Sequence, residues 1–167
     1  MKRIMLFLFA TSLFAACKGK GQQATKPEMG KNINSGQLIE ITKKSDFPAM
    51  VKLVEELSYI VLDSSKMEDG SLVYIAGEQK LFGNVLSCNI NSKNKINQTI
   101  FSTSDKETYN YLRKQLSSLG YKSSGKEKGS GKMIETEEFE KDNFIVAIAA
   151  RADDDTIEYE FTFLYML

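Results

Sequence analysis

The chain has 167 residues, of which 42% are hydrophobic and 26% are charged, so it can form one domain with its own core. Its formal net charge is zero, which argues against a nucleic-acid partner because phosphate binding needs a surplus of basic residues on one face. It contains no histidine and two cysteines, which excludes Ser-His-Asp and Cys-His catalysis, His-ligated zinc and a Cys₄ zinc site.

Residues 1–16 have the organisation of a secretory signal peptide. Lys2 and Arg3 form a short positive region, and an uncharged run rich in Leu, Phe and Ala extends from Ile4 to Ala16. This run of about a dozen residues is shorter than the ~20 that a transmembrane helix needs, and it has the length of a signal-peptide core. We therefore predict that residues 1–16 are a cleaved leader.

The leader runs into Leu13-Phe14-Ala15-Ala16-Cys17, which resembles the lipobox of bacterial lipoproteins, with Phe14 where Leu is usual. The resemblance implies that Cys17 becomes the first residue of the mature chain and carries fatty acyl chains, such as palmitate. Two or more acyl chains hold a protein stably at a membrane. The alternative is an ordinary cleaved signal or a buried helix, in which Cys17 has no such role.

The residue after Cys17 bears on the predicted location. In lipoproteins of this kind, an Asp directly after the Cys resembles a signal for retention in the inner membrane, and an acidic cluster after the Cys resembles a signal for surface export. This chain has Lys18 at that position and no acidic cluster after Cys17. We therefore predict a lipid anchor at the periplasmic face of the outer membrane of a bacterial cell envelope. The predicted partners are the membrane and an envelope protein, with no nucleic acid.

The mature chain is predicted to begin with a tether and to continue as one α+β domain. Residues 17–36, the lipidated N-terminus and tether, are polar and lack periodicity, which is typical of a flexible linker. Residues 37–167 form the domain. Within it, residues 37–42 predict a short strand.

A helix is predicted after this strand. Ser45 or Asp46 can cap its first amides, and Pro48 is tolerated in a first turn. The apolar residues of the helix have helical spacing: Phe47, Met50, Val51, Val54 and Leu57.

Strand-like runs and a second helix complete the domain. The runs are residues 59–62, 72–76, 82–90, 96–101, 132–139, 144–150 and 157–165, with a polar hairpin loop at 91–95. Ser104 and Glu107 have the spacing of a capping box, and Gly120 is placed to end the helix that follows. The helical stripe between them consists of Tyr109, Leu112, Leu116 and Leu119.

The two halves of the domain show the same pattern of a helix followed by strands. Segments 45–102 and 104–166 overlay with a shift of about sixty residues, which is within the range of a duplicated unit. Identities are few, and a chance recurrence is the alternative. We predict an antiparallel sheet with two helices packed on one face, built as two αβββ(β) repeats. This architecture is similar to that of small periplasmic inhibitor and assembly lipoproteins.

Two features are candidates for a functional site: Cys88, as a nucleophile, and the Gly/Lys-rich residues 123–132, as a phosphate-binding loop. Cys88 lies among apolar neighbours, so we interpret it as a small core residue; a reactive nucleophile is the alternative, but no histidine is present to act as its base. The P-loop spacing is not met, because Lys126 stands where its first Gly would be and Met133 replaces its hydroxyl residue. We interpret residues 123–132 as a mobile hairpin loop that can face a partner.

Acidic residues form two further candidate sites. Asp153, Asp154 and Asp155 could hold a hard cation, but without the rest of an EF-hand we interpret them as a polar turn between strands. The second group could support carboxylate catalysis, although a solvated strand face is the preferred interpretation. Its members are Glu135, Glu137, Glu138, Glu140 and Asp142.

The sequence thus predicts lipidation at Cys17 and identifies no catalytic, cofactor or metal residue. The preferred hypothesis is a non-catalytic, protein-binding envelope lipoprotein of the inhibitor, immunity or assembly type, which uses a sheet face or the Gly/Lys segment. The alternatives are a carboxylate-dependent envelope enzyme acting on a cell-wall or small-molecule substrate, and a structural component of the envelope.

Overall fold

The computed structural model of this protein describes residues 33–44, 46–68, 70–78, 84–91, 96–153 and 155–167. The predicted leader, Cys17 and the tether up to residue 32 lie outside these ranges. Within the ranges, no helix combines the length and the apolar character that crossing a membrane requires.

The described fold consists of helices on an antiparallel sheet. The helices are α1 (Ser35–Lys43), α2 (Phe47–Glu56) and α3 (Lys106–Ser118). The strands are β1 (Tyr59–Lys66), β2 (Leu72–Glu78), β3 (Asn84–Asn91), β4 (Ile96–Thr103), β5 (Lys122–Lys128), β6 (Met133–Lys141), β7 (Phe144–Asp153) and β8 (Thr156–Met166). All eight strands form one sheet in the order β1-β2-β3-β4-β8-β7-β6-β5. The α+β class with an antiparallel sheet is confirmed, but the described residues form three helices where two were predicted.

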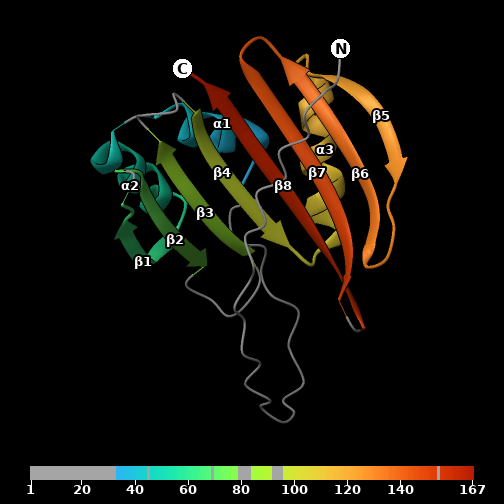
Figure 1. The fold of residues 1–167 in the computed structure, drawn as a ribbon, viewed down its shortest axis with the longest axis horizontal. Helices are drawn as coiled ribbons and strands as arrows, with labels where there is room; N and C mark the ends of the chain where they lie inside the picture. The colour runs from blue at the N-terminus through green and yellow to red at the C-terminus, as the bar shows by residue number, and fades with distance from the viewer. Residues whose placement is uncertain (1–32, 45, 69, 79–83, 92–95, 154) are drawn as a thin grey trace. The chain divides into compact units, whose positions relative to one another are not determined.

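Each half of the sheet is a meander of four strands that follows a helix. Helix α2 precedes β1 to β4, and helix α3 precedes β5 to β8. The last strands of the two meanders, β4 and β8, pair with each other at the centre of the sheet, from Ile96↔Met166 to Thr103↔Tyr159. The order of the strands is therefore the same from either edge inward (Figure 1).

Helix α1 replaces the strand that was predicted at residues 37–42. The Asn34 side chain accepts a hydrogen bond from the Gln37 amide at 2.9 Å, and the Gln37 side chain accepts one from the Asn34 amide at 2.8 Å. This capping box satisfies two amides that a helix start leaves open. Leu38 and Ile41, three residues apart, are both buried. The strand prediction was wrong because a segment of six residues is too short for apolar spacing alone to separate helix from strand.

Helices α2 and α3 confirm the two predicted helices, but their caps differ from the prediction. Asp46 is the N-cap residue of α2 and its side chain accepts no hydrogen bond from the helix, while Ser45 lies outside the described residues. Asp105, and not Ser104, caps α3: its carboxylate accepts from the amides of Glu107 at 3.2 Å and Thr108 at 3.0 Å. The Thr108 hydroxyl donates to the same carboxylate at 2.6 Å. At the other end, Gly120 has a φ of 85°, a left-handed conformation that favours glycine, and ends the helix as predicted.

The Gly/Lys segment is mostly a strand, which corrects the hairpin-loop prediction for residues 123–132. Strand β5 pairs with β6, and only the turn after Lys128 connects the two. The register shifts between Ser123 and Lys126, where Gly125 has a φ of 96°. Every side chain of β5 is exposed. The strand therefore has no apolar alternation, and only its pairing with β6 reveals it.

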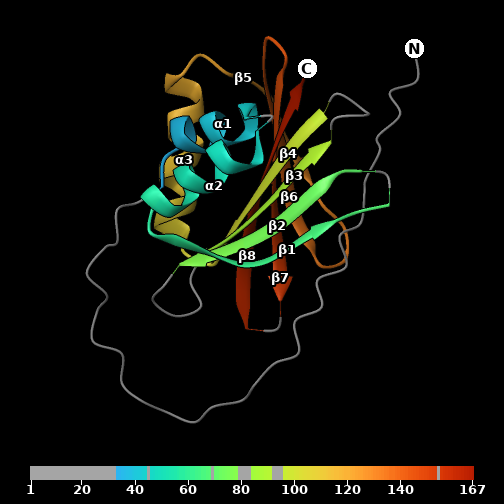
Figure 2. The same cartoon turned by 90° about the vertical axis from the view of Figure 1, so that its left-hand side faces the viewer.

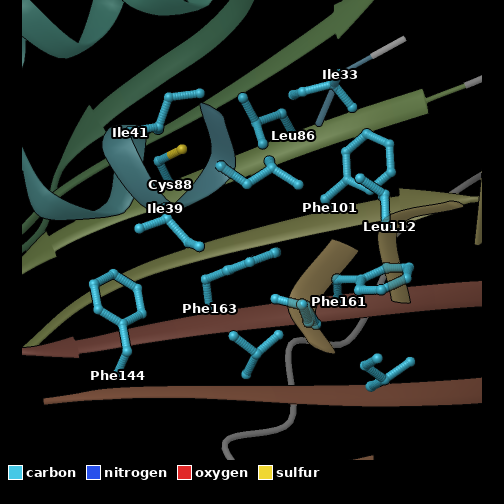
Figure 3. Packing of buried hydrophobic residues seen from close by; sticks show 14 of the residues in the cluster. Ile33, Ile39, Ile41, Leu86, Cys88, Phe101, Leu112, Phe144, Phe161 and Phe163 are labelled. Carbon is cyan, nitrogen blue, oxygen red and sulfur yellow. The ribbon is translucent and has the colours of Figure 1, made fainter. Parts of the chain in front are cut away.

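The core lies between the helices and one face of the sheet (Figure 2). Helix α1 contacts both central strands, β4 and β8. Phe101, Phe161 and Phe163 from these strands are completely buried beneath Leu112 of α3 and the isoleucines of α1 (Figure 3). Large aromatic side chains bury the most apolar area per residue, so this seam contributes much of the stability of the fold.

Candidate functional site

The face of the sheet that points away from the helices is the most extended surface feature of the described residues. On β4, residues alternate between buried and half-buried, and the half-buried ones point away from the core. Where all four central strands pair, they place twelve side chains there in three rows, and we call this set the open face. Strands β7 and β8 continue beyond it on the same side with the opposed pair Arg151 and Glu158. The rows are Asn89, Gln98, Leu164 and Ile145; Ser87, Ile100, Thr162 and Ala147; and Val85, Ser102, Glu160 and Ala149.

The open face is nearly uncharged. Glu160 is the one charged residue among the twelve, and its carboxylate lies 3.4 Å from the Arg151 guanidinium. The other members are aliphatic or uncharged polar side chains, and an uncharged polar group that finds a hydrogen-bond partner costs far less to remove from water than a charged one. Such a surface can be covered by another macromolecule without leaving an unpaired charge.

The two flanks of the open face differ in chemistry. On the β1–β2 side, Ile60, Leu62 and Ile75 are 43%, 60% and 38% exposed. A Cβ at Gly77 would come within 3.0 Å of the Leu62 side chain, so the glycine makes room for this leucine on the sheet. This flank, defined by Ile60, Leu62 and Ile75, is the apolar flank.

The β6–β5 side carries charge. Glu138 pairs with Ala147 and Glu140 pairs with Ile145, so both glutamates extend rows of the open face. Glu127 of β5 lies opposite Thr136 on the same side. This flank, defined by Glu127, Glu138 and Glu140, is the acidic flank. Lys122 of β5 lies opposite Glu140 on this side, so the flank is acidic in net charge only. Together the two flanks present apolar and net acidic groups beside a nearly uncharged centre.

The acidic run predicted from the sequence divides between the two faces of the sheet. Glu138 and Glu140 belong to the acidic flank, whereas Glu135 and Glu137 point toward α3. Glu137 is only 5% exposed, so the interpretation of the run as a solvated strand face is wrong for this residue. Asp142 lies in the β6–β7 turn with a φ of 52°.

Glu137 is held by two donors. The Arg113 guanidinium donates to both of its oxygens, at 2.5 Å and 2.9 Å, and the Ser123 hydroxyl donates at 2.6 Å. Burial disfavours the ionised form, yet the hydrogen bonds from Arg113 and Ser123 keep the pKa of Glu137 below its usual value. The carboxylate is therefore ionised and fully engaged.

Glu135, two residues before Glu137 on β6, has a similar arrangement. Lys126 donates to it at 2.6 Å and the Tyr109 hydroxyl donates at 2.9 Å. The hydrogen bond from Lys126 lowers the pKa of Glu135. A general acid needs a carboxyl that stays protonated, and both carboxylates are shifted in the opposite direction. We call the whole set the ionic cluster: Tyr109, Arg113, Ser123, Lys126, Glu135 and Glu137.

The ionic cluster joins α3 to the strands β5 and β6. Tyr109 and Arg113 come from the helix, Ser123 and Lys126 from β5, and the two glutamates from β6. Because β5 has no buried side chain, these bonds are what ties this edge strand to the helix. The cluster is therefore structural in its geometry, with its donors and acceptors used by one another.

Cys88 is a buried, free thiol, as the sequence predicted. It is 1% exposed and lies opposite Tyr74 on β2 and Thr99 on β4. Burial raises the pKa of the Cys88 thiol to about 12, although contacts with Tyr74 and Thr99 act in the other direction. Because the thiolate is the nucleophile, a thiol with this pKa is inert near neutral pH.

The aspartate triplet is at a turn, as expected. Strand β7 ends at Asp153 and β8 begins at Thr156, and Asp154 lies outside the described residues. Among the residues that the structure describes, no group of three or more acidic or thiol side chains is arranged to hold a metal ion.

A recess of about 470 Å³ lies beside α1 and the β6–β7 turn. Phe144 and Tyr165 stack at its base with ring centroids 4.9 Å apart. Lys141 at its rim donates to the Leu119 carbonyl at 2.7 Å, and Lys43 lies 3.5 Å from Glu40. Lys141, Lys43 and Glu40 are thus engaged with neighbouring protein groups.

Comparisons with known proteins give no match: no family model, no curated protein and no solved structure matches this chain. The functional argument therefore depends on the residues and surfaces described above.

Proposed function

We propose that this protein is a lipid-anchored component of a bacterial cell envelope that binds a protein partner without catalysis. The observation that supports the binding role is the open face, a nearly uncharged surface across four central strands with apolar and acidic flanks. Its charge pattern favours a partner whose contact surface combines apolar side chains with basic ones, since complementary charge steers association and fixes register.

The anchor in this proposal is Cys17. The lipobox-like sequence supports acylation there, and residues 18–32 of the predicted tether would connect the anchor to the domain. Residues 33–36 were predicted as tether but belong to the domain, because Ile33 and Ser35 are buried and α1 begins at Ser35. A flexible linker of about 15 residues has a mean reach of roughly 20 Å. We place the domain at the periplasmic face of the outer membrane, where its open face can reach a neighbouring envelope protein.

We also propose that the two halves arose by duplication. The matched order of strands supports this, and so does the way in which α2 and α3 end. Helix α2 is followed by Leu57-Ser58-Tyr59 and helix α3 by Leu119-Gly120-Tyr121. The middle residue of each triplet has a positive φ, 66° and 85°, and the tyrosine that follows is buried in both. The shared geometry at an equivalent position goes beyond a shared pattern of apolar residues.

The carboxylate-dependent enzyme is less well supported. Glu135 and Glu137 are the carboxylates that the fold brings together, and both are neutralised by cations of the ionic cluster. A hydrolytic pair would need one carboxyl to hold a proton near neutral pH. A purely structural envelope role differs from the binding role in lacking a saturable partner, so the binding experiment below separates the two.

The binding role can be tested in the anchored, full-length protein. Replacing Thr162 with arginine places a charge at the centre of the open face, where a bound partner would bury it. We expect recovery of a stoichiometric partner from crosslinked, detergent-solubilised envelope to fall at least tenfold. The matched control is Tyr111→Arg, on α3 at 43% exposure, which should retain binding. Equal recovery with both variants would contradict the assignment of the open face.

The anchor is tested separately. We expect the Cys17→Ser variant to remain uncleaved and to stay out of the detergent phase, and mass spectrometry of the native chain to find an acylated Cys17 at the N-terminus. A native chain that retains Met1, or one that starts at an unmodified residue, would rule the anchor out while leaving the binding test valid.

A further inference from the structure

Strand β1 is an edge of the sheet that is only partly protected. Among the described residues, no strand lies beside β1 on the side away from β2. An edge strand presents backbone amides and carbonyls that can pair with a further strand. The side chains of β1 after Val61 are all exposed.

The opposite edge, β5, has the features that prevent strand addition. Four of its seven residues are charged, Lys122, Lys126, Glu127 and Lys128, and Gly125 introduces a bulge with a positive φ. Charged side chains and bulges are how proteins block edge-to-edge pairing. Strand β1 also has a register shift, between Val61 and Asp63, but it begins with the run Tyr-Ile-Val-Leu. Strand β1 therefore begins with an uncharged run that can pair with an added strand, whereas β5 carries charged residues at both of its ends.

The apolar flank lies directly beside this edge. Ile60 is 43% exposed and Leu62 is 60% exposed, and both come from β1 itself. A strand added to β1 would lie about 4.8 Å away, so its side chains on this face would cover both residues. Backbone pairing and burial of the apolar flank would thus be achieved by one occupant.

We propose that β1 accepts a strand from the partner protein, an extended segment with alternating apolar side chains, which lengthens the sheet by one strand. This mode of recognition takes its affinity from backbone hydrogen bonds and its specificity from alternate side chains. The inference rests on the proposed function, because it assumes that the partner is a protein, and it adds where and how that partner binds.

A second copy of this chain fits the edge less well. Two copies of β1 that pair antiparallel along their length would set the polar half of one, from Asp63 to Lys66, against the apolar half of the other, from Tyr59 to Leu62. Such pairing leaves the apolar flank opposite polar side chains. An apolar strand from a different protein removes this mismatch.

The test uses the anchored, full-length protein in its own envelope, with a photo-crosslinking amino acid at Ser65 of β1. The matched position is Glu127 of β5, which is also exposed and at the opposite edge. We expect one partner to crosslink at position 65 and not at position 127. In the purified complex, the amides between Ile60 and Lys66 that point away from β2 should exchange with deuterium at least tenfold more slowly than in the free protein.

Two lysine variants test the edge without disturbing the core. Ile60→Lys should reduce the crosslink at least tenfold, whereas Ile134→Lys should retain it, since the two isoleucines are 43% and 40% exposed. Matching denaturation midpoints of both variants control for folding.

The outcomes separate this inference from the proposed function. A partner that binds while the β1 amides exchange freely, or that is lost equally in Ile60→Lys and Ile134→Lys, overturns strand addition and leaves the open face as the site. A crosslink between two copies of this chain at position 65 overturns it in favour of self-association. A chain that yields no partner at position 65 or position 127, and none from crosslinked envelope in its unmodified form, overturns both proposals.

Discussion

The two halves of the sheet have the same order of elements but are held together by different chemistry. In the first half, α2 packs on β1 and β2 through apolar contacts, such as Phe47 against Tyr74 with ring centroids 5.6 Å apart. In the second half, α3 is joined to β5 and β6 by the ionic cluster. The difference follows from the strands. Because β5 has no buried side chain, hydrogen bonds and ion pairs attach it to the helix, whereas buried apolar side chains hold the strands of the first half to theirs.

This contrast also distinguishes the two edges. A charged strand tied down by ion pairs is a closed edge, whereas a strand whose first half is apolar, with exposed isoleucine and leucine side chains, is open to a partner. Near-identical topology therefore leaves two surfaces with opposite properties. The predictions below test this difference, beginning with the largest expected effect.

Removing the cation of the buried pair should destabilise the second half most. We expect Arg113→Met to lower the free energy of unfolding by about 2–3 kcal/mol, because Glu137 is left buried without its partner. Urea denaturation measures the change. The control is Lys126→Met in the more exposed pair with Glu135, for which a loss of about 0.5 kcal/mol is expected. Equal losses in the two variants would mean that burial of Glu137 is energetically unimportant.

The same pair should make the protein sensitive to acid. The pKa of Glu137 is lowered from 4.5 in the folded state, so its contribution is present above pH 4.5 and is lost as the pH falls through the lowered value. We expect the wild-type stability to decline below about pH 4.5 more steeply than that of Arg113→Met. Parallel stability curves of the two proteins over this range would contradict the linkage.

The first half should instead be sensitive to alkali through Cys88. The pKa of its thiol is raised from 9.0 to about 12, so the folded state favours the neutral thiol. The contribution of this thiol to the free energy of unfolding is fully present below pH 9 and is lost as the pH rises toward 12. Over this range the free energy of unfolding falls by about 1.4 kcal/mol per pH unit. The Cys88→Ala variant should therefore show a flatter decline than wild type between pH 9 and pH 10, measured by urea denaturation, before the tyrosines titrate.

The smallest effect tests the equivalence of the helix ends. Ser58 and Gly120 both have a positive φ, which costs a serine more than a glycine. Ser58→Gly should stabilise the protein by about 0.5 kcal/mol and Gly120→Ser should destabilise it by about 1 kcal/mol. Thermal denaturation of the two variants measures both signs. Effects of the same sign would show that the two helix ends are not equivalent.

The central strands and two of the helices were predictable because apolar burial leaves a periodic pattern in the chain. Helix α3 was predicted from its stripe, and β8 from strict alternation, since Tyr159, Phe161 and Phe163 all point into the core. The burial of Cys88 followed from its apolar neighbours in the same way. These features depend on a residue's own hydrophobicity, which the sequence contains directly.

The remaining features depend on contacts between residues that are distant in the chain. Strand β5 is polar throughout, and only pairing with β6 makes it a strand. Glu137 and Glu138 are adjacent and chemically identical, yet one is bonded to Arg113 and the other lies on the acidic flank, because successive side chains of a strand point to opposite faces. The sequence alone determined the antiparallel α+β class and the central core, and the envelope location stays a prediction from the sequence. The tertiary structure decided which edge is closed, which is open and which carboxylates are neutralised, since each of these depends on the neighbours that folding supplies.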